Sequence, residues 1–179
     1  METHAIVMFP KNGGFVGRYV HFDGYPSGVG AALLRIVQRD GLDMAREILV
    51  MKTPSWLCLK TGPEWLLRIH EDLSLSTLML DGNIGDMVKF PGSKNSYLVN
   101  GYGKSEIWGE LIVYSNTKEY VDVCEWIYVL EDGGLRCAKT EHKIGAEADD
   151  FSWLLTFPWS TRPSDLADLI EVEMGLADE

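Results

Sequence analysis

The residue types best suited to chemistry gather in one short stretch, residues 21–30, which reads HFDGYPSGVG. His21 and Asp23 are two residues apart, so at the end of an extended strand both side chains lie on the same face. An imidazole oriented by a carboxylate can act as a general base, and such a pair can also bind a metal. His21 and Asp23 are therefore the candidate catalytic residues. The alternative is a structural histidine, because the pair has no obvious third partner.

Glycines follow this pair with the spacing Gly24-x-x-x-Gly28-x-Gly30, between an expected strand and an expected helix. Such a turn is a generic anion site, because free backbone N–H groups and the helix dipole point towards the ligand. The alternative is structural, since turns, a helix cap at Ser27 and close packing at the glycines explain the same residues. The candidate ligand-binding residues are His21, Asp23, Tyr25, Ser27, Gly28 and Gly30.

Known nucleotide- and metal-binding motifs do not fit the chain. The glycine spacing occurs in short-chain dehydrogenases, but Pro26 lies inside the loop and strands do not alternate with helices along the chain. No Gly-Lys-Ser/Thr follows, which excludes a Walker loop. Residues 81–86, DGNIGD, depart from the residue order of a calcium loop. The cysteines form no C-x-x-C pair and no H-E-x-x-H spacing occurs, so we expect neither a metal nor a cofactor.

The elements that would position residues 21–30 follow from turn signals and hydrophobic periodicity. Asn12-Gly13 predicts a hairpin between apolar strands at 5–9 and 15–22. After the glycines, residues 27–41 place their apolar side chains at i, i+4, i+7 and i+8, which indicates an amphipathic helix. A second, shorter helix is expected over 42–51. The hairpin would thus deliver the candidate site to the start of the first helix.

The second half of the chain predicts more sheet and one further helix. Residues 107–115 and 119–139 are typical of strands, with a turn at Asp132-Gly133, and Pro163 with Ser164 begins a C-terminal helix. The apolar face of that helix comprises Leu166, Leu169 and Ile170, and the acidic residues of its outer face and tail are Asp165, Asp168, Glu171, Glu173, Asp178 and Glu179. We therefore predict a single α+β domain over residues 1–179, an antiparallel sheet of about five strands with two or three packed helices.

The composition is that of a globular domain, with 46% hydrophobic and 24% charged residues among 179. The formal net charge is -11, from 27 acidic and 16 basic residues. Such a field repels nucleic-acid backbones, so nonspecific DNA or RNA binding is not expected, whereas a partner with a basic face fits it. We expect no membrane association, and we expect Cys58, Cys124 and Cys137 to be buried, reduced thiols of a cytoplasmic protein.

The segment RYVHFDGYPSGVGAALL (18–34) resembles the Y-C-H-W-D-G-Y-P-x-x-x-G core of a widespread set of small, uncharacterised proteins of phages, prophages and bacteria. The preceding KNG turn is similar as well, and EWIYVLEDGGL is similar to that set's E-Y-x-Y-x-x-x-x-G segment. The resemblance covers roughly residues 5–50 and 105–139. Val20 and Phe22 replace the usual Cys and Trp, so no role for a cysteine carries over. The resemblance implies an accessory protein of a phage or mobile element, acting in a bacterial cytoplasm.

Three functional hypotheses follow. The first, favoured by the incomplete catalytic set, is a non-enzymatic binding protein that holds a small anionic ligand such as a nucleotide at Ser27–Gly30, or docks a host protein through its aromatic and acidic surface. The second is a small hydrolase or nucleotide-processing enzyme that uses His21 and Asp23. Its third polar group would come from Lys94, Tyr102 or Lys104. The third is a minor structural protein of the virion. None of them fixes an oligomeric state.

Overall fold

The computed structural model describes residues 3–59, 87–89, 96–99, 102–106, 109–114, 124–140 and 154–175. The strands in these ranges are β1 (Ala5–Lys11), β2 (Gly14–Val20), β3 (Trp56–Leu59), β4 (Met87–Lys89), β5 (Ser96–Val99), β6 (Gly103–Glu106), β7 (Ile112–Tyr114), β8 (Trp126–Glu131), β9 (Gly134–Lys139) and β10 (Leu155–Phe157). Three helical stretches accompany them. They are a π-helical segment η1 (Pro26–Gly30) continuing into α1 (Ala31–Asp40), α2 (Leu42–Arg46) continuing into a π-helical segment η2 (Glu47–Lys52), and a 3-10 turn η5 (Pro163–Asp165) leading into α5 (Leu166–Glu173).

Both predicted hairpins are confirmed. Strands β1 and β2 pair antiparallel from Ala5 opposite Val20 to Lys11 opposite Gly14. The two turn residues, Asn12 and Gly13, have φ angles of 52° and 79°, as the tight turn of a twisted hairpin requires. Strands β8 and β9 form the second hairpin around residues 132–133.

The sheet is larger than predicted and mixed rather than antiparallel. Ten strands join in the order β10-β9-β8-β1-β2-β3-β6-β5-β4, with β7 paired to β2. Strand β1 runs parallel to β8, and β2 runs parallel to β3. The second parallel pair arises because the helices of residues 26–52 carry the chain back before β3 begins, as a helical crossover does. The α+β class is thus confirmed, whereas the expected count of about five strands is wrong.

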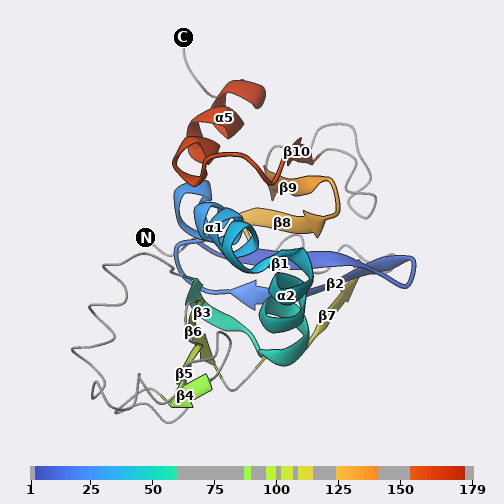
Figure 1. Ribbon diagram of the computed structural model, residues 1–179, viewed down its shortest axis with the longest axis vertical. Coiled ribbons are helices and arrows are strands. Elements are labelled where there is room, and N and C mark those ends of the chain that lie inside the picture. Colours follow the sequence, from blue (N-terminus) through green and yellow to red (C-terminus); the bar gives the residue numbers. More distant parts are fainter. Residues whose placement is uncertain are drawn as a thin grey trace, which may run out of the picture.

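The helices α1 and α2 cover one face of β1 and β2, and α5 lies beyond the N-terminal end of α1 (Figure 1). The largest apolar cluster fills the space between this face and α1. Its fully buried members include Val7, Val20, Leu33, Ile36 and Trp56. A second cluster, with Ile6, Met8, Ile127 and Val129, lies on the opposite face of the same strands. Because side chains alternate along a strand, β1 and β8 supply residues to both clusters.

The C-terminal helix packs on the start of the first one. Leu166 and Ile170 of α5 are fully buried, but Leu169 is 40% and Val172 is 64% exposed. Of the three residues predicted on the apolar face of this helix, Leu166 and Ile170 are thus buried, whereas Leu169 is partly exposed. Within the described ranges, no helix has the length and apolar character that crossing a membrane requires.

Candidate functional site

The corner formed by residues 21–30 is closed by its own backbone. Asp23 adopts a left-handed φ of 58° and accepts a 2.9 Å hydrogen bond from the Val29 N–H. Gly28 N–H donates to the Tyr25 carbonyl at 2.9 Å, and Gly24 N–H donates to the Thr3 carbonyl at 2.8 Å. Two of the N–H groups that the sequence offered to an anion at this helix start are therefore already bonded within the chain.

The helix begins two residues earlier than a cap at Ser27 would place it. Tyr25 is its extended N-cap, with φ of -69° and ψ of 162°, and Pro26 is the first helical residue. Proline suits this position because it has no N–H to satisfy and its φ is already helical. No side chain caps this start, and Ser27 is exposed. The predicted cap at Ser27 is therefore wrong.

Asp23 and Tyr25 form the polar contact of the corner. The Tyr25 hydroxyl donates to Asp23 Oδ1 at 3.0 Å, and this bond, with some burial, raises the pKa of Tyr25. The Asp23 side chain also lies close to the helix start, since its Cβ is 3.1 Å from the position that a Cβ on Gly28 would occupy. A carboxylate there is favoured by the helix dipole. An anionic ligand would have to compete with it.

Gly28 and Gly30 have packing roles. A Cβ on Gly28 would collide with the Asp23 carbonyl oxygen. A Cβ on Gly30 would lie 2.7 Å from Leu166 Cδ2 and 3.1 Å from Tyr128 Cε1. Glycine at position 30 thus allows η1 to approach both α5 and β8, and the structural interpretation of these two glycines has direct support.

His21 belongs to a cluster that we call the histidine cluster, formed by His4, Tyr19, His21 and Phe22. The rings of His4 and His21 stack with centroids 4.8 Å apart, and Phe22 meets the His21 ring edge-on at 4.4 Å. The Tyr19 hydroxyl lies 3.2 Å from His21 Nδ1. His4 Nδ1 donates to the His21 carbonyl oxygen at 2.7 Å, which fixes the proton of His4 on that nitrogen.

The side-chain contacts described for His21 are with His4, Tyr19 and Phe22, whereas the one described for Asp23 is with Tyr25. The strand ends at Val20, and the left-handed backbone of Asp23 interrupts the alternation on which a shared face depended. Sequence reasoning missed His4, although a signal existed. A hairpin that pairs residue 5 with residue 20 around Asn12-Gly13 brings residues 4 and 21 next to each other.

A second polar cluster, also missed, lies at the C-terminal end of α1. Arg39 Nη2 binds Asp40 Oδ2 at 2.8 Å, and the Asp40 side chain is only 6% exposed. The Arg39 guanidinium lies over the Tyr102 ring, 5.4 Å from its centroid. Burial, and then the Asp40 carboxylate, raise the pKa of Tyr102. Of the three groups proposed to complete a catalytic set, Tyr102 is thus buried in this cluster, Lys104 lies half-buried on β6, and Lys94 falls outside the described residues.

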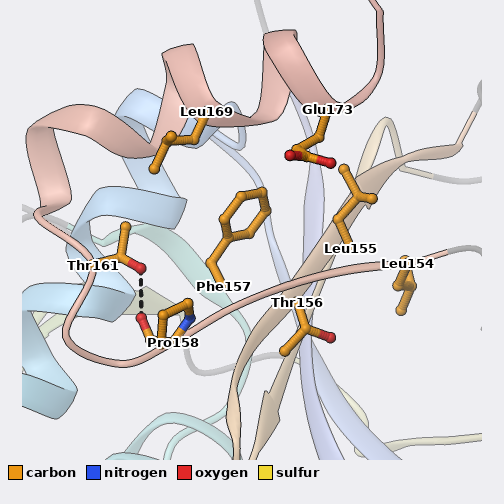
Figure 2. A pocket seen from close by; sticks show the side chains of 8 residues that line it. All are labelled: Leu154, Leu155, Thr156, Phe157, Pro158, Thr161, Leu169 and Glu173. Atoms are coloured by element: carbon orange, nitrogen blue, oxygen red, sulfur yellow. Dashed lines mark hydrogen bonds between the residues drawn. The ribbon is translucent and has the colours of Figure 1, made fainter.

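An open cavity of about 580 Å³ lies between α5 and β10 (Figure 2). Its lining residues are Leu154, Leu155, Thr156, Phe157, Pro158, Thr161, Leu169 and Glu173. Leu169 and Glu173 extend from α5 towards Phe157 and Leu155 (Figure 2). The Thr161 hydroxyl donates to the Pro158 carbonyl at 2.6 Å and fixes the turn that closes one end. Sequence reasoning did not foresee this cavity, and none of its lining residues belongs to the corner.

The described residues contain no group of three or more His, Cys, Asp or Glu side chains that could hold a metal ion. In comparisons with protein-family models, curated proteins and solved structures, the chain has no match. The resemblance of residues 18–34 to phage and prophage proteins accordingly stays a prediction.

Proposed function

We propose that this protein is a non-enzymatic binding protein that docks a basic partner protein on the surface formed by α5 and β10. The observation that carries the proposal is the apolar cavity, which opens beside acidic residues of α5 that form no ion pair within the described part of the chain. The sequence resemblance adds a setting, an accessory protein of a phage or mobile element acting on a host protein in the bacterial cytoplasm.

The charge of α5 supports a basic partner. Asp168, Glu171 and Glu173 are exposed, and no ion pair within the described part of the chain involves any of them. The last turn of α5 contains no basic residue, so Glu171 and Glu173 face the negative end of the helix dipole. A cationic group from another molecule would relieve the repulsion between these carboxylates and the helix dipole. The net charge of -11 would attract such a molecule towards the protein.

Exposed apolar side chains on the same helix support a protein partner. Leu169 is 40% and Val172 is 64% exposed, and Leu169 also lines the cavity. Apolar side chains rimmed by charged ones beside a concave site are typical of protein-binding surfaces. Electrostatic attraction alone does not require an apolar cavity. The acidic charge and the apolar cavity together therefore favour docking of a polypeptide.

The corner at residues 21–30 supports a small anionic ligand less well. Its Gly28 and Val29 N–H groups donate to carbonyls of the chain, and the Asp23 side chain lies close to the helix start. A small hydrolase that uses His21 and Asp23 remains the second candidate function. The contact between the Tyr19 hydroxyl and His21 Nδ1 at 3.2 Å favours it, because such a contact orients an imidazole.

The test is a titration with an identified partner. Affinity capture from a bacterial lysate supplies the partner, and calorimetry with the purified pair then measures Kd for wild type and for Asp168→Lys/Glu171→Lys. We expect Kd to rise with salt concentration and to rise about tenfold or more in the double variant. Asp43→Lys, an exposed acid on α2, is the control with the same type of charge change. A partner that binds wild type and the α5 variant equally would overturn the proposal.

A further inference from the structure

We propose that the partner contributes an extended segment that adds to β10 at the edge of the described sheet, inserts an aliphatic side chain into the cavity and places a lysine or arginine beside Glu173. This inference rests on the proposed function, because it names the mode of binding at the same surface.

The edge of the sheet is the first argument. β10 is the last strand of the sheet order, and it pairs with β9 on one side, with Leu155 opposite Cys137 and Phe157 opposite Leu135. Among the described strands, none pairs with its other side. An edge strand presents backbone N–H and C=O groups that can pair with an incoming chain, a recurring mode of peptide recognition.

The position of the cavity is the second argument. β10 supplies Leu155, Thr156 and Phe157 to its lining, so a strand added at that edge would run beside the cavity (Figure 2). Its volume of about 580 Å³ lies within the range of roughly 300–1,000 Å³ usual for ligand pockets. Because the lining is mainly aliphatic and aromatic, the side chain that fits it is aliphatic.

The charge at the rim is the third argument. Glu173 lines the cavity, is exposed, and is in no ion pair among the described residues. Side chains two positions apart in a strand point to the same face and are about 7 Å apart. The bound segment should therefore carry Lys or Arg two residues from its aliphatic anchor. A second copy of this chain fits poorly, since it would bring the same acidic helix towards Glu173.

The experiment is a selection from a random heptapeptide library displayed on phage, with the folded full chain as bait. We expect enrichment of an aliphatic residue with Lys or Arg two positions away. The most enriched heptapeptide is then synthesised with a fluorescent label, and its Kd is measured by anisotropy. Methylation of alternate backbone nitrogens of the peptide should weaken binding about tenfold or more at one set of positions and little at the other, because only one set pairs with β10.

Protein variants test the roles of the cavity and of the charge at its rim. Glu173→Gln should weaken binding of the peptide about two- to fivefold, and Asp43→Asn, at an exposed acid on α2 outside the cavity lining, should not. Leu169→Trp should weaken it by filling the cavity, with circular dichroism showing that the variant is folded.

The outcomes separate this inference from the proposed function. If a captured partner depends on Asp168 and Glu171 but no selected peptide competes with it, strand addition is wrong and the docking function stands. Equal loss of binding on methylation of either set of nitrogens, or none on both, also rejects strand addition. If neither a partner nor a peptide binds, both proposals fail.

Discussion

Tyr128 on β8 and Gly24 in the corner are joined by a buried hydrogen bond, in which the tyrosine hydroxyl donates to the Gly24 carbonyl at 2.7 Å. The two residues are 104 positions apart in the sequence. On its other side, Gly24 N–H donates to the Thr3 carbonyl at 2.8 Å. The corner is therefore held between β8 and the residues before β1, and its shape depends on the assembled sheet.

Replacing Tyr128 with Phe should destabilise the protein. The change leaves the ring in place but strips the buried Gly24 carbonyl of its donor, and an unsatisfied buried group costs about 1–3 kcal/mol. Urea unfolding followed by circular dichroism measures the loss. Tyr25→Phe is the matched control, because that hydroxyl bonds at the surface to Asp23 and its removal should cost less than about 1 kcal/mol. Equal effects of the two variants would contradict this assignment.

Gly30→Ala should displace α5. A methyl group at this position would lie 2.7 Å from Leu166 Cδ2, and Leu166 is fully buried and cannot swing into solvent. We expect a loss of about 1–3 kcal/mol, the usual effect of overpacking a core. Gly133→Ala, where a Cβ would meet nothing within 4 Å, is the control. Thermal unfolding compares them, and an unchanged Tm for Gly30→Ala would show that α5 is not packed there.

Local signals predicted the parts of the fold that local geometry determines. Asn12-Gly13 selects a tight hairpin turn, and the turn sets the register that pairs Ala5 with Val20. The periodicity after Ser27 likewise predicts the helix that ends at Gly41, whose φ of 91° suits glycine. Both features depend on residues close together in the chain.

The missed parts depend on contacts distant in sequence. Strand β2 runs parallel to β3 across a helical crossover, with Val20 opposite Trp56. Strand β1 runs parallel to β8, with Ala5 opposite Trp126. No turn residue marks such pairings, and strands of three or four residues are too short to show alternation. The cavity was missed for the same reason, since Leu155 and Leu169 meet only when α5 folds back over β10. For the candidate site, the sequence located the corner but not the contact between His4 and His21.

Tyr102 should make the protein sensitive to alkali. Burial and the neighbouring Asp40 raise its pKa above the usual value of 10.0 in the folded state. Its contribution to stability is therefore complete below about pH 10, where the unfolded tyrosine is still protonated, and is lost as the pH rises towards the raised folded pKa. Denaturant midpoints between pH 8 and pH 11 should fall less steeply for Tyr102→Phe than for wild type. Tyr25→Phe, which removes an exposed phenol, should keep most of the slope. Identical slopes for wild type and Tyr102→Phe would reject this role.

The acidic residues in the last turn of α5 should lower stability while they serve binding. Glu173 lies in the last turn of the helix, which contains no basic residue, so Glu173→Lys should stabilise the isolated protein by about 0.3–1 kcal/mol. Asp168 lies in the first turn, where a carboxylate is favoured, so Asp168→Lys should have the opposite sign. Urea unfolding at low and high salt measures both, and the two effects should shrink together as salt screens the dipole.

Both variants should nevertheless bind a basic partner more weakly, because each removes one negative charge from the docking surface and adds a positive one. Stabilisation by Glu173→Lys together with weaker partner binding would show that the chain retains an unfavourable charge for recognition. Unchanged binding would assign that charge no role in docking.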